Sequence, residues 1–301
     1  MRRQIAAASL TALTACVGTA DSVLEPTPPE PDHTNTLSRD VIGVAAGMSF
    51  SCGLNRDGTI ACWGYAWDPT EMTPPYGSFT AISAGNSHAC ALRLDGTITC
   101  WGSERETLPE TLVAPPGRFI SISAGNTHNC ALRPDRTAVC WGQNRYGESV
   151  APAGTFLAIS PGFNHTCGVR DNGAIECWGR ADMYGTPPAG TYVDVTVRNT
   201  GYMNCGLQSS AVPSCWAAPS PIRAPQEPFI TISSGFDYTC GIREAGTLIC
   251  WSHEGEAGWA PAGEYVALQG GYYHFCAIRN DGKVVCWGND WYGQSSTPPQ
   301  T

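Results

Sequence analysis

The chain has 301 residues, of which 42% are hydrophobic and 14% are charged, and its net charge at pH 7 is −9. Proteins that bind polyanions normally present a basic face, so this charge balance argues against a nucleic acid partner. The sequence has no apolar run of about 18 residues, so it predicts no transmembrane helix. Gly and Pro are frequent and scattered evenly, which favours many short strands joined by turns.

The first segment has the order of a secretory signal. Arg2 and Arg3 form a short positive region, a mildly apolar stretch follows over residues 4–13, and a small residue precedes Cys16. With Leu13 at the third position before the cysteine, this segment resembles the signal of bacterial lipoproteins. The resemblance implies that Cys16 becomes the N-terminus and is acylated. An ordinary signal peptide that ends near a cysteine is the alternative.

Three regions follow from this reading: a signal peptide (1–15), a lipid-anchored, Pro-rich tether (16–40) and a repeat region (41–301). The prolines of the tether favour an extended, semi-rigid chain. Val17 follows Cys16 where an Asp would favour retention in the inner membrane. We therefore expect an exported protein of the bacterial cell envelope, held at the outer membrane by its lipid anchor only.

The cysteines reveal the organisation of the repeat region. Fourteen of the fifteen cysteines fall into seven pairs, and the members of every pair are ten positions apart. The first cysteines of the first and last pairs are 224 residues apart in six steps, so the period is near 37 residues. A fixed period of about 20–50 residues indicates a repeat architecture. The pairs are Cys52 and Cys62, Cys90 and Cys100, Cys130 and Cys140, Cys167 and Cys177, Cys205 and Cys215, Cys240 and Cys250, and Cys276 and Cys286.

Other residues recur in register with the cysteines. A tryptophan follows the second cysteine of every pair. In most copies, an aromatic–x–x–aliphatic–x–x–Gly segment precedes the pair, as in Phe79, Ile82 and Gly85. Each unit is therefore predicted to contain a strand, a tight turn, a second strand, a hairpin, a third strand and a loop.

The predicted hairpin explains the cysteine spacing. Residues 93–97 suit a type I turn followed by Gly96 in the left-handed conformation. Counting back from this loop places Cys90 opposite Cys100, at a Cα separation of about 4.5 Å, which a disulfide allows. Zinc sites usually use closer spacings, and an exported chain meets an oxidising compartment. We therefore predict seven disulfides and no metal.

Two copies depart from the pattern. In the third copy, Arg136 replaces the hairpin glycine, which predicts a strained backbone. The fifth copy lacks the glycine before Cys205, has no Asp-Gly turn over residues 208–211, and places Pro213 in its third strand. Proline there indicates an edge strand or distorted pairing. The fifth copy is either degenerate or specialised for a partner.

Residues 82–102, with the pattern ISAGxxHxCALxxDGxxxCWG, resemble the repeat of the regulator of chromosome condensation family. Residues 141–148 and 287–294 resemble the loop that follows the last strand of that repeat. The resemblance covers residues 41–301, and members with paired cysteines are the most similar. It implies an all-β fold, a seven-bladed β-propeller with one repeat per blade, and we expect a monomer.

Two recurring side chains raise the question of a ligand in the centre of the ring. Histidines two positions before a cysteine pair could bind a metal, but the family repeat favours histidine there as a hydrogen-bonded strand residue. Recurring arginines could hold an anion, but pairing with turn acids such as Asp95, Asp135 and Asp281 is the preferred interpretation. These residues are His88, His128, His165 and His274, and Arg93, Arg133, Arg170, Arg243 and Arg279. No metal or cofactor is predicted.

The sequence offers no phosphate loop, no nucleophile elbow and no catalytic carboxylate pair, so no catalytic residue is nominated and no enzyme is predicted. Loops after the blade tryptophans vary most between copies and carry aromatic side chains, which often dominate binding energy. We expect them to bind an unidentified protein or glycan, although some could instead pack between blades. A propeller lyase or hydrolase with a channel site, and guanine-nucleotide exchange by family analogy, are the alternatives. The candidate binding residues are Trp67, Tyr146, Tyr184, Trp259, Trp291 and Tyr292.

Overall fold

The computed structural model describes residues 36–65, 73–103, 109–198, 203–216, 223–252, 255–256 and 260–301. All of them belong to one unit of the chain, residues 35–301, which is separate from residues 1–34. The predicted acylation site Cys16 and the candidate binding residues Trp67 and Trp259 lie outside the described residues. No helix within the described ranges is long and apolar enough to span a membrane.

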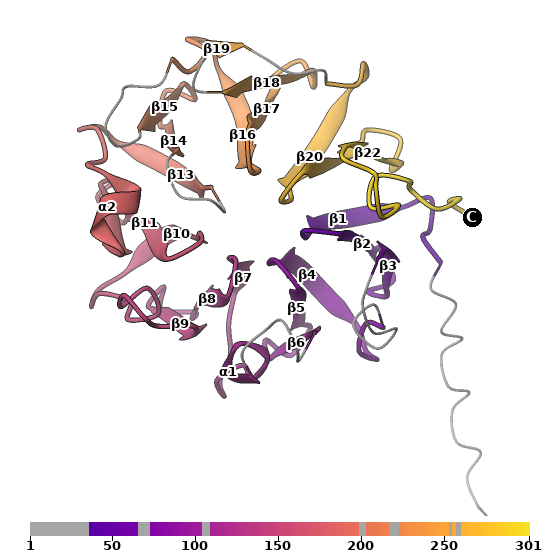
Figure 1. Ribbon diagram of the computed structural model, residues 1–301, viewed down its shortest axis with the longest axis horizontal. Helices are drawn as coiled ribbons and strands as arrows, with labels where there is room; N and C mark the ends of the chain where they lie inside the picture. The colour runs from indigo at the N-terminus through magenta and orange to yellow at the C-terminus, as the bar shows by residue number, and fades with distance from the viewer. Residues whose placement is uncertain are drawn as a thin grey trace, which may run out of the picture. The chain divides into compact units, whose positions relative to one another are not determined.

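The described residues form seven antiparallel sheets in a ring, which confirms the predicted seven-bladed propeller (Figure 1). In every blade, the strands run outward in chain order, so the first strand lies nearest the axis. The strands are β1 (Val41–Ala46), β2 (Phe50–Asn55) and β3 (Ile60–Gly64) in blade 1; β4 (Phe79–Ala84), β5 (His88–Arg93) and β6 (Ile98–Gly102) in blade 2; β7 (Ser121–Ala124), β8 (His128–Leu132) and β9 (Ala138–Gly142) in blade 3; β10 (Phe156–Pro161), β11 (His165–Arg170) and β12 (Ile175–Gly179) in blade 4; β13 (Tyr192–Val197), β14 (Asn204–Gln208) and β15 (Pro213–Trp216) in blade 5; β16 (Phe229–Ser234), β17 (Thr239–Arg243), β18 (Leu248–Ser252) and β19 (Gly255–Glu256) in blade 6; and β20 (Tyr265–Gly270), β21 (His274–Arg279) and β22 (Val284–Gly288) in blade 7. The short helices α1 (Pro109–Leu112) and α2 (Ala181–Tyr184) lie in the loops after blades 2 and 4.

The hairpin between the middle and outer strands sets the cysteine register, as the spacing predicts. In blade 2, the N–H of Arg93 donates to the carbonyl of Thr97, and Gly96 has a φ of +86°. This register places Cys90 opposite Cys100. The middle and outer strands of the other blades bring their cysteines opposite each other in the same way.

All seven predicted disulfides are present, with Cα–Cα distances of 4.0 to 4.1 Å. Every bond lies within one blade, and none joins two blades. From blade 1 to blade 7, the bonds join Cys52 to Cys62, Cys90 to Cys100, Cys130 to Cys140, Cys167 to Cys177, Cys205 to Cys215, Cys240 to Cys250, and Cys276 to Cys286. The first cysteine of each pair is fully buried on the middle strand.

The departures from the hairpin pattern have the expected structural results. Arg136 in blade 3 and Ala211 in blade 5 both have a φ of +65°, where the other described hairpins of this type have glycine. A side chain in the left-handed region costs about 1 kcal/mol. Pro213 begins β15, the outer edge strand of blade 5, where its missing N–H disturbs no further ladder.

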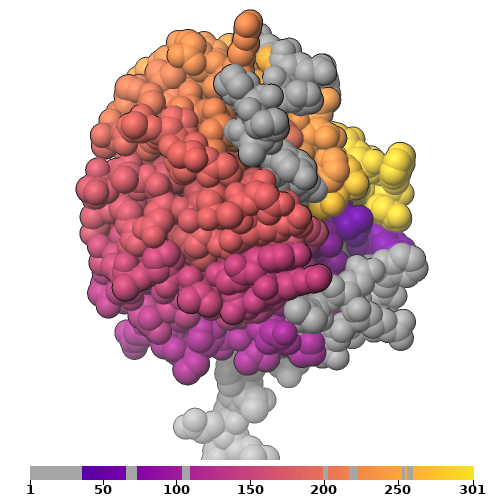
Figure 2. Space-filling model, turned by 60° about the vertical axis from the view of Figure 1, so that its left-hand side comes forward, coloured from indigo at the N-terminus to yellow at the C-terminus, as the bar shows by residue number. Residues whose placement is uncertain are grey.

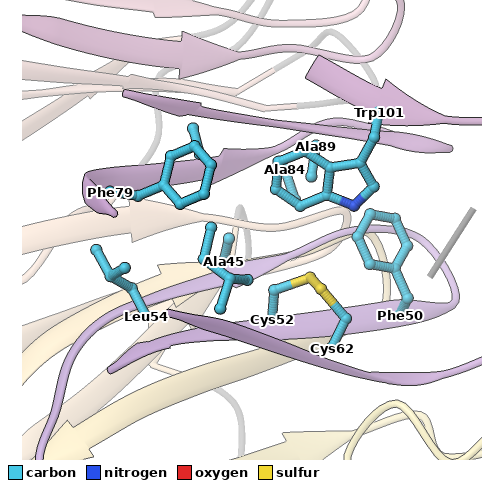
Figure 3. Packing of buried hydrophobic residues seen from close by; sticks show 11 residues of the cluster. Ala45, Phe50, Cys52, Leu54, Cys62, Phe79, Ala84, Ala89 and Trp101 are labelled. Atoms are coloured by element: carbon cyan, nitrogen blue, oxygen red, sulfur yellow. A yellow bond between two sulfur atoms is a disulfide. The ribbon is translucent and has the colours of Figure 1, made fainter. Parts of the chain in front are cut away.

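The hydrophobic core consists of clusters between neighbouring blades. Between blades 1 and 2, the disulfide of Cys52 and Cys62 packs beside Leu54 of its own blade and against Phe79 and Trp101 of the next (Figure 3). The same kinds of residue meet at the other junctions. In the space-filling view, the coloured blades follow one another without a break from purple to orange (Figure 2). Each disulfide therefore links two strands of its own blade and also provides apolar surface for the next blade.

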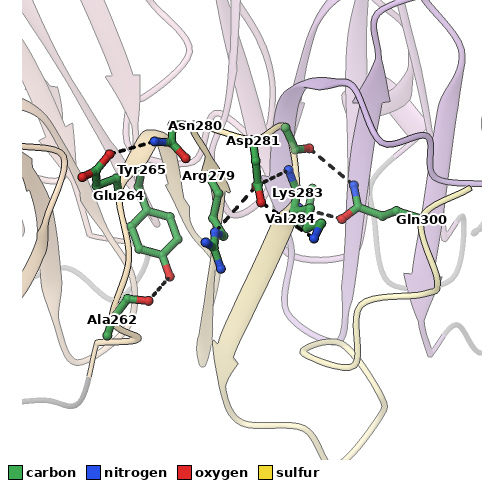
Figure 4. A network of polar contacts seen from close by, with 10 residues as sticks. Ala262, Glu264, Tyr265, Arg279, Asn280, Asp281, Lys283, Val284 and Gln300 are labelled. Atoms are coloured by element: carbon green, nitrogen blue, oxygen red, sulfur yellow. Dashed lines mark hydrogen bonds and ion pairs between the residues drawn. The ribbon is translucent and has the colours of Figure 1, made fainter.

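The ring closes through residues near the two ends of the described unit. Leu37 is fully buried and forms a parallel bridge with Gln300, and the N–H of Thr301 donates to the Leu37 carbonyl at 3.2 Å. The Gln300 amide donates to the carbonyl of Ser38 and accepts from the N–H of Val284 (Figure 4). Leu37, which precedes β1, is therefore part of the packed ring.

Candidate functional site

Among the described residues, the loops after the blade tryptophans begin on the same face of the ring as the turns between inner and middle strands. The backbone shows this directly, because the N–H of Asn289 in such a loop donates to the carbonyl of Tyr273 in such a turn at 2.9 Å. The N–H of Arg180 makes the equivalent bond to Asn164 in blade 4. We call this surface the loop face. The hairpins between middle and outer strands lie on the opposite face.

Exposed aromatic side chains concentrate on the loop face. Eight aromatic side chains are exposed in the described part of the chain, and seven of them belong to loop-face turns, loops or strand ends. The eighth, Tyr76, lies before β4 on the opposite face, where its carbonyl accepts from Arg93. The distribution favours the loop face as the binding surface. Its exposed aromatic residues are Tyr65, Tyr146, Phe163, Tyr238, Tyr273, Trp291 and Tyr292.

Two predicted binding residues project from the loop after blade 7. Trp291 is 85% exposed, and Tyr292 is 47% exposed and stacks on Tyr65 at a ring distance of 5.2 Å. Hydrogen bonds fix the loop beneath them, since Gln294 accepts from the N–H of Tyr292 and donates to the side chain of Asn289. An exposed indole on a fixed loop is a suitable binding anchor because little conformational freedom is lost on contact.

The other predicted residues have different surroundings. Tyr146 is exposed, but the guanidinium groups of Arg145 and Arg180 lie within 5.5 Å and 5.3 Å of its ring centroid. Tyr184 is half-buried, and its ring lies 5.9 Å from that of His165 in the junction between blades 4 and 5. Tyr184 therefore packs between blades. This is the alternative to binding that the sequence left open for the candidate aromatic residues.

The acidic residues of these loops mainly hold the loops in place. Glu148 is fully buried, and its carboxylate accepts from the N–H groups of Arg145 and Tyr146. The Ser296 hydroxyl donates to the Asp290 carboxylate and lowers its pKa, and the N–H groups of Ser295 and Ser296 contribute further. The Glu148 carboxylate is consequently not exposed to a partner.

The four recurring histidines are buried and link neighbouring blades. Each of them begins a middle strand, and its Nε2 contacts a polar side chain of the following blade. This agrees with their interpretation as hydrogen-bonded strand residues. The contacts are His88–Asn129 (2.7 Å), His128–Thr166 (2.7 Å), His165–Asn204 (3.0 Å) and His274–Ser51 (2.6 Å).

The donor in each histidine contact can be assigned from the second hydrogen bond that the partner side chain makes. Asn129 donates its amide N–H to the carbonyl of Thr111 at 2.9 Å, so its oxygen is left to accept from Nε2–H of His88. Trp141 donates to the same carbonyl at 3.1 Å. The carbonyls of Glu148, Tyr184 and Gln294 accept from the corresponding tryptophans and polar side chains at three more junctions. We call this repeated arrangement the junction network. It ties a histidine, the next blade and the intervening loop together.

Burial keeps these histidines neutral. It lowers the pKa of His88, His165 and His274 to about 4 and that of His128 to about 3, where the charges of His165 and His88 contribute further. Within the described ranges, no group of three or more His, Cys, Asp or Glu side chains is placed to hold a metal ion. The histidines therefore act as neutral donors to the junction network.

The recurring arginines lie near the hairpins on the opposite face, and most do not pair with turn acids as expected. Arg279 does lie 3.6 Å from Asp281 (Figure 4). Asp95 instead accepts from the N–H and hydroxyl of Thr97, and Arg93 lies over the ring of Phe79. The prediction is wrong for blades 2 and 3, because Thr97 and Thr137 donate to the carboxylates of Asp95 and Asp135 within the turn. Arg133 stacks likewise on Phe119, Arg170 pairs with Glu176, and Arg243 pairs with Glu227.

Sequence reasoning missed a pocket between blades 6 and 7 on the loop face. It has a volume of about 360 Å³, and Phe236, Tyr238, Tyr272 and Tyr273 line it together with Asp237. None of these residues belongs to a loop after a blade tryptophan. A signal was present in the sequence, because copies 2 and 3 have small polar residues and histidine at the same positions, as in residues 86–88.

Comparisons with known proteins agree with the repeat and the fold. Residues 79–106, 119–148 and 265–294 match the family model of the regulator of chromosome condensation (RCC1) repeat. The search of curated proteins gave no match.

The chain also resembles solved propeller structures. The CRINKLY WD40 ectodomain of the Arabidopsis thaliana receptor kinase ACR4 is similar at a TM-score of 0.69 and 22% identity, covering 84% of this chain and 97% of that one. The ectodomain of the Physcomitrella patens receptor kinase CR4 gives 0.67 and 23%, with coverages of 83% and 73%, and human WBSCR16 gives 0.65 and 12%, with coverages of 80% and 87%. At these identities, the likeness shows the fold alone. The chain is a seven-bladed propeller that carries repeats of the regulator of chromosome condensation type.

Proposed function

We propose that this propeller is an exported interaction module that binds a protein through the aromatic side chains of its loop face. The observation that carries the proposal is the distribution of exposed aromatic residues, seven of eight of which lie on that face in the described part of the chain. Tyrosine and tryptophan anchors are enriched at the centre of protein interfaces. The disulfides and junction network support the face on a rigid ring, which reduces the entropy cost of binding.

Export is supported by the seven disulfides, because such bonds persist in oxidising compartments. Two similar structures are receptor-kinase ectodomains, which is consistent with a propeller that works outside the cytoplasm. We propose further that acylated Cys16 holds the protein at the bacterial outer membrane. Two acyl chains suffice for stable attachment, whereas one is marginal. Cys16→Ser should move the protein from the membrane to the soluble fraction, and continued membrane attachment would contradict the anchor.

The binding proposal is tested by affinity capture from cell-envelope extract, with identification of the retained protein and measurement of its dissociation constant. Trp291→Ala should weaken that complex by about 2 kcal/mol, the loss typical of a hot-spot anchor. Tyr76→Ala is the matched control, because Tyr76 is 65% exposed on the opposite face. Equal affinity for both variants and the wild type would remove this part of the loop face from the interface. Loss of binding on Tyr76→Ala alone would assign binding to the opposite face.

A further inference from the structure

The pocket between blades 6 and 7 occupies positions where the repeat has changed. In blades 2 and 3, the turn after the inner strand contains Asn86 and Ser87, or Asn126 and Thr127, and a histidine follows. Blade 6 has Phe236, Asp237 and Tyr238 at these three positions, and blade 7 has Tyr272 and Tyr273 before its histidine. Backbone bonds around the ring are nevertheless kept, since the N–H of Phe236 donates to the carbonyl of Tyr272 at 2.9 Å. The change therefore concerns the side chains and not the turn.

These substitutions bring aromatic rings from two blades together. The ring of Phe236 lies 4.8 Å from that of Tyr272 and 5.0 Å from that of Tyr273, and the last two are 4.7 Å apart in an edge-on arrangement. Tyr238 and Tyr273 are 39% and 42% exposed, so the cluster borders solvent. Phe275, Trp287 and the cysteines Cys240 and Cys250 also line the cavity. The result is an open cavity with aromatic walls, whose volume of about 360 Å³ is large enough to receive one side chain.

The described residues that line the pocket include one acidic side chain. Among the described residues that line it, Asp237 is the one that carries a charge, and it is exposed at the solvent side. Burial lowers the pKa of the Arg198 guanidinium of blade 5, and attraction by the Asp237 carboxylate partly offsets this. Arg198 does not line the cavity. A ligand that enters therefore meets one carboxylate and several π-faces, all of which favour positive charge.

We infer that this pocket binds a cationic side chain, arginine or lysine, of the protein partner. The inference rests on the proposed function, because it assigns part of that interface a position and a chemistry. Aromatic rings attract a cation through their quadrupoles, and the attraction is strongest where the cation is desolvated. The Asp237 carboxylate adds a charge-assisted hydrogen bond. An uncharged apolar side chain would use the rings but would desolvate the carboxylate without compensation.

The test uses a small probe, so it does not depend on finding the partner. Nα-acetylarginine N-methylamide is titrated into the purified propeller, and the chemical shifts of the aromatic protons are followed by NMR. The neutral citrulline compound of the same shape is the matched control. We expect saturable binding of the arginine probe and at least about tenfold weaker binding of citrulline, the factor that follows from loss of a desolvated cation–π contact.

Variants that introduce residues found in another blade test whether the probe binds in this pocket. Phe236→Asn with Tyr273→Ser restores the residues that blade 2 carries at the same positions, so the fold should persist. It should abolish saturable binding of the arginine probe. Asp237→Asn keeps the shape and removes the charge, and it should weaken the arginine probe several-fold while leaving citrulline unchanged. Thermal unfolding and the shifts of residues in blades 2 and 3 verify that each variant is folded.

Three results would overturn the inference: equal binding of citrulline and arginine, arginine binding that survives in the folded double variant, and no saturable binding to the wild type. Preferential binding of methyl glucoside would also overturn it and would assign the cavity to a glycan. Each of these results concerns the pocket alone. The partner captured in the Trp291→Ala experiment is a separate readout, so failure of the proposed function is distinguishable from failure of the pocket.

Discussion

Blades 2 and 6 have the same three-strand core and the same disulfide, but they differ in the turn between the inner and middle strands. In blade 2, His88 follows that turn and joins the junction network. In blade 6, Tyr238 takes the histidine position and lines a pocket instead. Residues shared by the repeats hold the ring together, and the departures form the surface that we propose a partner recognises.

The largest expected effect concerns a feature that both blades share. Replacement of Cys90 and Cys100 by Ala should lower the free energy of unfolding by up to about 3 kcal/mol, because the unfolded chain loses its restraint. Loss of contact with Phe119 and Trp141 adds to this. Urea unfolding measures the change, and mass spectrometry of non-reduced peptides verifies the remaining pairs. Unchanged stability would contradict a structural role for the disulfide.

The second effect tests the junction network. Asn129→Ala removes the acceptor of His88 Nε2–H in a fully buried site, and an unsatisfied buried donor costs about 1–3 kcal/mol. Binding of the arginine probe at the pocket of blades 6 and 7 should not change. Asn280→Ala is the control, since Asn280 contacts Glu264 at the exposed surface (Figure 4) and should cost below about 0.5 kcal/mol. Equal losses in both variants would count against the network.

The third prediction concerns pH. The four histidines titrate near 6.5 when unfolded, but burial lowers their pKa to between about 3 and 4. Between pH 6.5 and 4, the unfolded chain therefore binds more protons than the native chain, so stability falls as pH falls. Asp194 opposes this, because burial raises its pKa to about 6 and the native chain gains that proton first. The histidines outnumber Asp194, so the net change should be a loss.

His128→Phe sharpens this test, because blade 1 carries Phe50 at the same position of the repeat. Urea unfolding at pH 7 and pH 5 should show a smaller difference between the two pH values for the variant than for the wild type. A difference of the same size in both proteins would show that His128 is not a source of the acid sensitivity.

The smallest effect concerns the hairpin of blade 3, where Arg136 replaces the usual glycine. Arg136→Gly should relieve the strain of a positive φ and stabilise the protein by up to about 1 kcal/mol, less the added freedom of the unfolded chain. The reverse change in blade 2, Gly96→Arg, should destabilise by a similar amount. If both changes leave the urea midpoint in place, the left-handed position imposes no measurable strain.

Much of the fold follows from the sequence because its determinants are local. The spacing within each cysteine pair sets the hairpin register, and the seven pairs give seven repeats. The family resemblance implied that each repeat forms one propeller blade. The histidine interpretation also came from the repeat. The partners of the histidines could not be predicted, because Asn129, Thr166, Asn204 and Ser51 are chemically different residues that perform the same function.

The pocket was missed for a spatial reason. Phe236 and Tyr272 are 36 positions apart in the chain, and only the packing of neighbouring blades brings their rings together. The variable loops after the tryptophans drew attention because they differ in length. Substitutions inside a turn of constant length give a weaker signal. Comparison of copy 6 with copies 2 and 3 would have shown that residues 236–238 replace two small polar residues and a histidine.

The measurement that tests the central claim most directly compares two variants on two readouts. The double variant Phe236→Asn with Tyr273→Ser replaces pocket residues that differ from those of blade 2. Asn129→Ala replaces a residue of the junction network. The account predicts that the first loses arginine-probe binding and keeps its unfolding free energy within about 1 kcal/mol of the wild type. It predicts that the second loses about 2 kcal/mol of stability and keeps probe affinity. If the double variant retains probe affinity, or if Asn129→Ala loses affinity while still folded, the division between structural and binding positions is contradicted.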